Sequence, residues 1–108
     1  MRCIHVEVVY QGSHCPASFY MARAVEEILP LYGDRVRFTK VEYQKSKDHS
    51  KRFLELSICL YGEDAVRNGF RLAPIPSLFI NGKLVFDAIP VRDELEIAIE
   101  TFLEGRDY

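Results

Sequence analysis

The sequence has no long hydrophobic run and no strong excess of charge of either sign. It nowhere approaches the roughly 18 consecutive apolar residues of a membrane-spanning helix, and its N-terminal apolar run is too short for a signal peptide. Its 14 basic and 16 acidic residues give a net charge of −2. The two signs are interleaved, which is unlike the basic stripe of a nucleic-acid-binding surface. We therefore expect a cytoplasmic protein that binds neither membrane nor nucleic acid.

Cysteine is also scarce. Cys3, Cys15 and Cys59 are an odd number at irregular spacing, which argues against both a disulfide framework and a zinc-finger pattern. Cys3 and Cys15 stand at opposite ends of one expected strand, about 20 Å or more apart, which is too far for a disulfide bond. These features favour a reducing compartment.

Internal repeats, linkers and low-complexity segments are missing as well. The 108 residues are 48% hydrophobic and 28% charged, which are ordinary values for a globular protein. This length is typical of one domain with a single core. We expect residues 1–108 to form that domain.

The hydrophobic pattern predicts alternating strands and helices in the first part of the chain. The expected strand at 35–43 carries four charges, and its alternation of apolar and polar residues is interrupted midway. We therefore expect an edge strand that is protected by charge or by a bulge. In order, we expect a strand at 3–10, a helix at 16–29, a strand at 35–43, a helix at 48–61 and a loop with one helical turn at 62–73.

The last third of the chain carries a hairpin signal. Asn81-Gly82 separates two short apolar runs, 77–80 and 83–86, and this dipeptide suits the two positive φ angles of a type I′ turn. A helix is expected at 91–103. The whole order predicts an α/β fold of the form βαβ–α–ββα, in which the first two strands are parallel.

Three helices are expected to bury one stripe each. The first stripe should contain Phe19, Ala22, Val25 and Leu29, which recur at helical spacing. In the second helix Cys59 neighbours the apolar stripe, so packing is its expected role. The third helix should bury Val91, Leu95, Ala98 and Phe102.

Cys15 stands where the first strand gives way to the first helix. Pro16 follows it at the first helical position, which proline favours. A helix N-terminus offers free N–H groups and about half a positive charge, and this can lower a cysteine pKa from about 8.5 into the range of roughly 3.5–7.5. A free cysteine is more often buried and inert, but small and polar neighbours favour exposure here. We interpret Cys15 as a reactive thiol. That His14 tunes it by charge when protonated is a secondary hypothesis, because adjacent residues on a loop often point apart.

Two segments resemble the thioredoxin-like superfamily. They are Cys15-Pro16-Ala17-Ser18 at the first strand–helix junction, and Ile75-Pro76 in the stretch that leads into the hairpin. The resemblance implies a thioredoxin-like fold with a four-stranded mixed sheet flanked by helices. It also implies that Cys15 is the nucleophile, that Ser18 replaces the second cysteine and that Pro76 is a cis-proline.

The substrate site follows from the same resemblance. Ile75, which precedes the cis-proline, offers its backbone N–H and C=O to an extended substrate. His14 and Pro16 flank Cys15 and complete this site. His14 takes the place of the tryptophan that commonly precedes the nucleophile in thioredoxins.

Two further departures from the family bear on chemistry. Val9 stands where thioredoxins place a buried acid that deprotonates the second cysteine, so the acid and that cysteine are lost together. Phe86-Asp87 replaces the Gly-Gly with which monothiol glutaredoxins bind glutathione. This weakens the case for glutathione use and for a glutathione-ligated cluster.

The leading hypothesis is a monothiol thioredoxin-like oxidoreductase or isomerase that needs no cofactor and no metal. Cys15 would form a mixed disulfide with a protein or small-thiol partner. Two alternatives stay open. The fold could be a non-catalytic binding or assembly module with a docking groove between Cys15 and Pro76, or Cys15 could bind an iron–sulfur cluster together with an external thiol. His5 and His49 are expected to be packing and surface residues.

Overall fold

Four strands form one mixed sheet at the centre of the molecule. They are β1 (Ile4–Tyr10), β2 (Val36–Glu42), β3 (Ser77–Ile80) and β4 (Lys83–Phe86). Their order is β2-β1-β3-β4; β1 and β2 run parallel, and β3 runs antiparallel to both β1 and β4. The computed structural model describes residues 3–12, 15–42, 44–106 and 108. It confirms the predicted α/β fold with a four-stranded mixed sheet.

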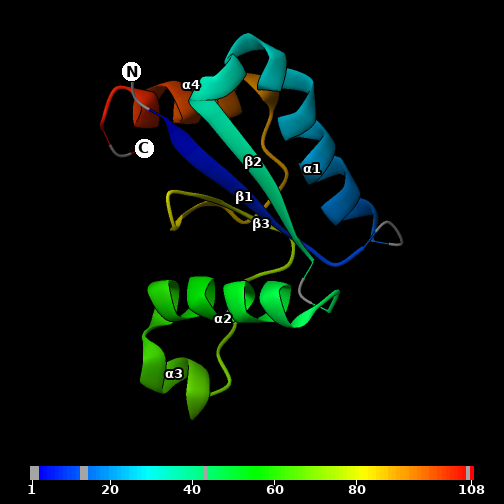
Figure 1. Ribbon diagram of the computed structural model, residues 1–108, viewed down its shortest axis with the longest axis vertical. Helices are drawn as coiled ribbons and strands as arrows, with labels where there is room; N and C mark the ends of the chain where they lie inside the picture. Colours follow the sequence, from blue (N-terminus) through cyan, green and yellow to red (C-terminus); the bar gives the residue numbers. More distant parts are fainter. Residues whose placement is uncertain (1–2, 13–14, 43, 107) are drawn as a thin grey trace.

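Helices cover both faces of this sheet (Figure 1). They are α1 (Pro16–Ile28), α2 (Lys47–Tyr61), the short α3 (Glu63–Arg67) and α4 (Arg92–Leu103), and two 3₁₀ turns span Leu29–Leu31 and Gly33–Arg35. α1 and α4 lie on one face, and α2 lies on the other with α3 beyond it. None of the helices among the described residues is long and apolar enough to cross a membrane.

The alternation of β1 explains the two layers, because successive side chains of a strand point to opposite faces. Ile4, Val6 and Val8 belong to the core that packs against α1 and α4. Val9 belongs to the second core, which packs against Phe53 and Leu56 of α2. The central strand is therefore buried on both faces.

Glu7 breaks the apolar pattern of the central strand and yet is only 2% exposed. Arg52 of α2 donates two hydrogen bonds to its carboxylate, at N–O distances of 2.7 and 2.6 Å. A buried charge that is paired and hydrogen-bonded is tolerated. Forty-five residues separate the two partners, so local sequence patterns cannot reveal this pair.

α1 begins at Pro16 as predicted, and it buries Ala22 and Val25 as expected. Phe19 is 41% exposed, so its assignment to the core was wrong. The buried position at the start of the helix is Ser18 rather than Phe19, and a hydrophobicity pattern does not register a serine. The side chains that α1 buries are Ser18, Met21, Ala22, Val25 and Ile28.

β2 is an edge strand as predicted, and it keeps an unbroken register with β1. The irregularity lies instead between Leu78 and Phe79 in the β3–β4 pair. Charged side chains rather than a bulge therefore protect the β2 edge, which is one of the devices that natural edge strands use.

The hairpin and the last helix largely follow the sequence pattern. Asn81 and Gly82 have φ angles of 52° and 82°, which confirms the type I′ turn. α4 buries Leu95, Ala98 and Phe102 as expected, but Val91 is its N-cap residue and is 62% exposed. The expectation for Val91 was wrong because α4 starts one residue later than predicted.

Candidate functional site

Cys15 occupies the N-cap position of α1, five residues beyond the end of β1. Its backbone is extended, with φ −100° and ψ 103°. Its N–H donates to the Gly12 carbonyl at 3.0 Å, and its own carbonyl accepts from the Phe19 N–H at 3.0 Å. These bonds hold the half-buried thiol at the end of the helix where free N–H groups gather.

Ser18 lies one turn along α1 and its side chain is fully buried. Its Oγ accepts a hydrogen bond from the backbone N–H of Gln11 at 3.3 Å and donates one to Cys15 Sγ at 3.2 Å. Because the oxygen accepts from Gln11, its proton is free to point at the sulfur. The connection Gln11–Ser18–Cys15 thus joins the start of the loop between β1 and α1 to the thiol.

These contacts hold the pKa of the Cys15 thiol below its ordinary value. The largest cause is the Ser18 hydroxyl, followed by the backbone N–H of Ser18; partial burial of the sulfur acts in the opposite direction, and the Ala17 N–H adds a further lowering. A hydrogen bond to the charged form of a group favours that form. The site therefore stabilises a thiolate.

Ile75 and Pro76 lie at the same end of the sheet as Cys15, where β1 ends and β3 begins. Ser77, the first residue of β3, pairs with Val9 near the end of β1, and Ile75 and Pro76 immediately precede it, both half-buried. The Ile75–Pro76 peptide bond is cis, as predicted. The register therefore places the two segments that the sequence singled out at the same end of the sheet.

The other predicted site residues have different outcomes. Pro16 is exposed at the first position of α1. His14 lies outside the described residues. Cys59 is exposed, so the expectation that it packs in the core was wrong: the buried stripe of α2 contains Phe53, Leu56 and Ser57, and Cys59 lies to the side of it.

Sequence reasoning missed the part that Gln11 plays, since a backbone N–H leaves no mark in a side-chain pattern. It also missed the burial of Ser18. The signal for Ser18 was its spacing, because a residue three positions after an N-cap shares its face of the helix. No group of three or more His, Cys, Asp or Glu side chains that could hold a metal ion occurs among the described residues.

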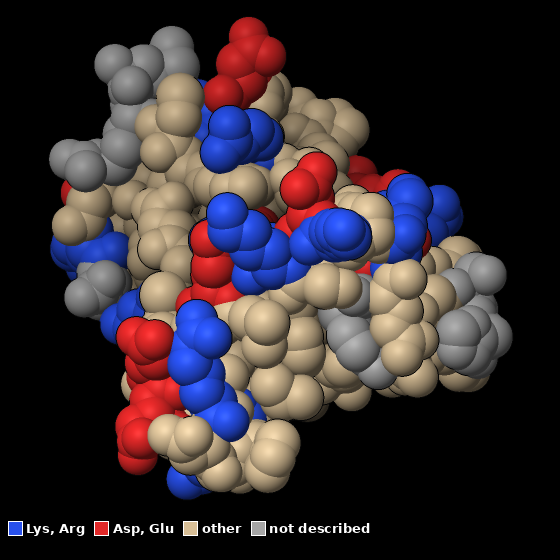
Figure 2. Space-filling view, turned by 60° about the horizontal axis from the view of Figure 1, so that its bottom comes forward, with Lys and Arg blue, Asp and Glu red and all other residues tan. Residues whose placement is uncertain are grey.

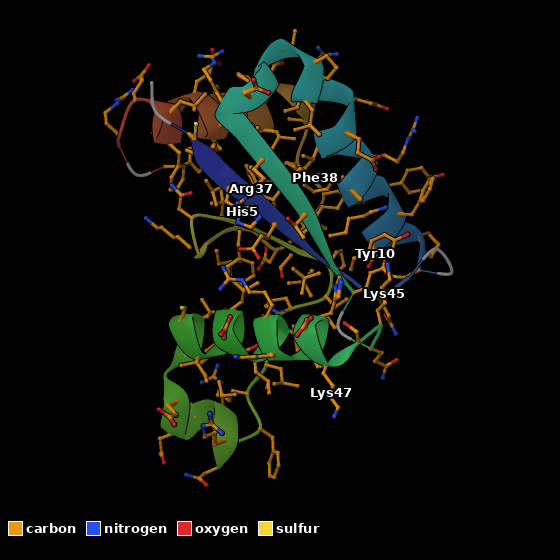
Figure 3. The ribbon with its side chains drawn as sticks, in the orientation of Figure 1. His5, Tyr10, Arg37, Phe38, Lys45 and Lys47 are labelled. Atoms are coloured by element: carbon orange, nitrogen blue, oxygen red, sulfur yellow. The ribbon has the colours of Figure 1, made fainter. Side chains whose placement is uncertain are left out.

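A separate polar cluster surrounds His5 on the α2 side of the sheet, where Figure 3 shows His5 and Arg37 side by side. The His5 Nδ1 atom accepts from Arg37 at 3.2 Å, and Nε2 donates to Thr39 Oγ1 at 2.8 Å. Desolvation lowers the pKa of His5, Glu7 raises it, and Arg37 and Arg52 lower it further. His5 is therefore a neutral packing residue near neutral pH, as its sequence environment suggested.

No protein-family model matches this chain, and no curated protein matches it.

Proposed function

We propose that this chain is a monothiol thiol–disulfide exchange protein of the thioredoxin-like kind, with Cys15 as its nucleophile. The observation that carries the proposal is the hydrogen bond from the buried Ser18 hydroxyl to Cys15 Sγ at the N-terminus of α1. Reactive cysteines occur where such donors lower the thiol pKa and solvent still reaches the sulfur.

The reaction begins with attack on a disulfide. The Cys15 thiolate donates its electron pair to one sulfur of a substrate R–S–S–R′, the S–S bond breaks, and R′–S⁻ leaves with the electrons of that bond. The product is the mixed disulfide Cys15–S–S–R. Cys15 and one substrate sulfur have exchanged partners, and no external oxidant or reductant is consumed.

Release of R requires a second thiolate from outside the chain. Ser18 carries an oxygen and cannot displace a sulfur. Cys59 lies on α2, on the opposite face of the sheet from α1 (Figure 1), and Cys3 precedes the far end of β1. An external R″–S⁻ attacks the sulfur of R, forms R–S–S–R″ and regenerates the Cys15 thiolate.

The surroundings of the thiol agree with a monothiol site. The only buried carboxylate among the described residues is that of Glu7, and it is held by Arg52 on the α2 side of the sheet. It is therefore not available to a group at position 18, on the α1 side. On this proposal the backbone of Ile75 contacts an extended substrate, and His14 and Pro16 flank the thiol.

The proposal is tested by incubating the protein with bis(2-hydroxyethyl) disulfide and mapping adducts by mass spectrometry. We expect a mixed disulfide to accumulate on Cys15 well ahead of Cys3 and Cys59, and a Cys15→Ala variant to lose the fast phase. Equal rates at the three cysteines would overturn the proposal.

A further inference from the structure

The solvent face of α2 carries a second, unexpected apolar stripe. The helix packs Phe53 and Leu56 against the sheet, while Leu54 and Ile58 lie on its opposite side, and Leu54 is 44% exposed. Lys47 and Lys51 lie on the same face of the helix, nearer its N-terminus, since positions 47, 51, 54 and 58 recur at helical spacing. Figure 3 shows Lys47 directed away from the sheet.

α3 and the segment after it turn this stripe into a groove. The groove, which we call the α2–α3 groove, has a volume of about 350 Å³. That volume lies within the range of sites that bind ligands or anchor side chains. Five of its six lining residues are apolar, and the six are Leu54, Ile58, Val66, Arg67, Phe70 and Leu72.

Phe70 is held outside the protein by the backbone at the mouth of this groove. It is 84% exposed and has φ +56°, a conformation that bulky residues rarely adopt. Its two neighbours, Gly69 and Arg71, donate their N–H groups to the same acceptor, the Ala65 carbonyl, at 3.0 and 3.1 Å. A Cβ atom at position 69 would lie 2.7 Å from that oxygen. The turn therefore holds the backbone so that the Phe70 side chain stands exposed beside the groove.

Basic side chains stand at both ends of the α2–α3 groove. Lys47 and Lys51 lie at one end, and neither forms an ion pair within the described part of the chain. At the α3 end Arg67 lines the groove, and Arg71, four residues further on, lies over the Tyr61 ring at 4.5 Å. Arg67 pairs with Glu63 at 2.9 Å, but both side chains are well exposed, so this pair contributes little and can be exchanged for an incoming carboxylate.

We propose that the α2–α3 groove binds one amphipathic helix of a partner protein, whose apolar residues pack on Leu54, Ile58 and Phe70 and whose carboxylates meet the basic residues at the two ends. Helix-in-groove recognition uses this arrangement of apolar anchors. From position 47 to position 58 this face of α2 is about 16 Å long, with lysines in its first half and apolar residues in its second. That length matches about three helical turns. Because the turn already restrains the backbone at Phe70, less backbone entropy is lost when a partner binds there.

Two other occupants fit the charges less well. A second copy of this chain would bring its own basic residues against Lys47, Lys51 and the two arginines. An anionic membrane would meet a concave surface whose flank also carries Glu55 and Glu63. In Figure 2, where the α2–α3 side comes forward, uncharged surface at the lower edge lies beside basic side chains, with acidic ones on one flank.

The test uses two synthetic helical peptides of about four turns, capped at both termini. Both carry Leu and Phe on one face; one has Glu residues at its ends, and the other has Lys residues at the same positions. We expect fluorescence anisotropy to show binding of the Glu peptide alone, with an affinity that falls as salt is added.

Three variants locate this binding. Phe70→Ser should weaken it at least tenfold, and the double variant Lys47→Glu/Lys51→Glu should reverse the preference toward the Lys peptide. Val91→Ser, which changes another exposed apolar side chain, at the N-cap of α4 (62% exposed), is the matched control and should bind as the original protein does. None of these changes should alter the alkylation of Cys15, so the groove and the thiol are tested separately.

Four outcomes would overturn the inference. They are equal binding of both peptides, unchanged binding by Phe70→Ser, binding of phosphatidylserine vesicles in place of the peptide, and a dimer in light scattering that Phe70→Ser abolishes. The last two would assign the groove to a membrane and to a second copy of the chain.

Discussion

Arg52 of α2 and Glu7 of β1 form a bidentate ion pair in which the carboxylate is 2% exposed and the Arg52 side chain 37%. The guanidinium also donates to Glu55 at 3.3 Å. Hydrogen bonding to Glu7 is the largest cause of a raised Arg52 pKa. This pair ties α2 to the central strand at the one acidic position of that strand.

Arg52→Ala should lower the free energy of unfolding by about 2 kcal/mol, because it leaves a buried carboxylate without its partner, and this figure allows for the partial exposure of the arginine. Urea denaturation measures the loss. Arg23→Ala is the control, since Arg23 and Glu27 form a 4.0 Å pair in which both side chains are exposed, and it should cost less than about 0.5 kcal/mol. Equal losses in the two variants would show that the buried pair does not stabilise the fold.

His5 should make stability depend on pH. Its pKa in the folded protein lies below its ordinary value, mainly through desolvation, so the unfolded chain binds a proton more readily. The stability that the neutral ring contributes is present above about pH 6.5 and is lost as the pH falls through the lower, folded-state pKa. We expect His5→Asn to reduce the stability difference between pH 7.5 and pH 5.5, as measured by urea denaturation. An unchanged difference would mean that His5 has no part in it.

Ser57 should stabilise the segment that leads to Pro76. Its buried hydroxyl donates to the Phe53 carbonyl and accepts from the Ala73 N–H, both at 2.9 Å. Ser57→Ala leaves that N–H without a partner in the core and should cost about 1–2 kcal/mol. Thr101→Ala is a matched control, because Thr101 also donates to the carbonyl four residues earlier but lies on the surface side of α4. Thermal denaturation that ranks the two variants equally would refute this account of Ser57.

The predictions from local sequence that the structure confirms rest on the backbone preferences of single residues. Asn81-Gly82 requires a specific turn, and Pro16 suits the first turn of a helix, so both could be read without knowing the fold. The expectation of a cis bond at Ile75–Pro76 came from resemblance instead. It agreed with the structure.

The failures share a different cause, which is that burial depends on partners far away in the chain. Ser18 is buried because a backbone N–H of the preceding loop bonds to it, and a hydrophobicity pattern assigned Phe19 in its place. Glu7 is buried because Arg52 reaches it from the far helix. The α2–α3 groove could not be predicted either, because the outer apolar residues of α2 line a groove only when α3 folds beside them.

Replacing Ser18 by cysteine should convert the site to a dithiol. The serine Oγ lies 3.2 Å from Cys15 Sγ, so a sulfur at that position is within reach of a disulfide after a small side-chain adjustment. We expect Ser18→Cys to form that disulfide, to shed a bound partner and to gain disulfide reductase activity. The gain should be modest because Val9 supplies no acid for the new thiol. Mass spectrometry and an insulin-reduction assay measure both effects, and a variant that retains its adduct would contradict the proposed exchange.

The most direct test of the proposed function is the rate of iodoacetamide alkylation of each cysteine as a function of pH, followed by peptide mass spectrometry. The Cys15 rate should rise with a midpoint clearly below the free-thiol value of about 8.5. Ser18→Ala should move that midpoint upward, because the Ser18 hydroxyl is the largest cause of the lowered pKa. Cys3 and Cys59 serve as internal references. A Cys15 midpoint at or above about 8.5, unchanged by Ser18→Ala, would contradict a redox role for this thiol.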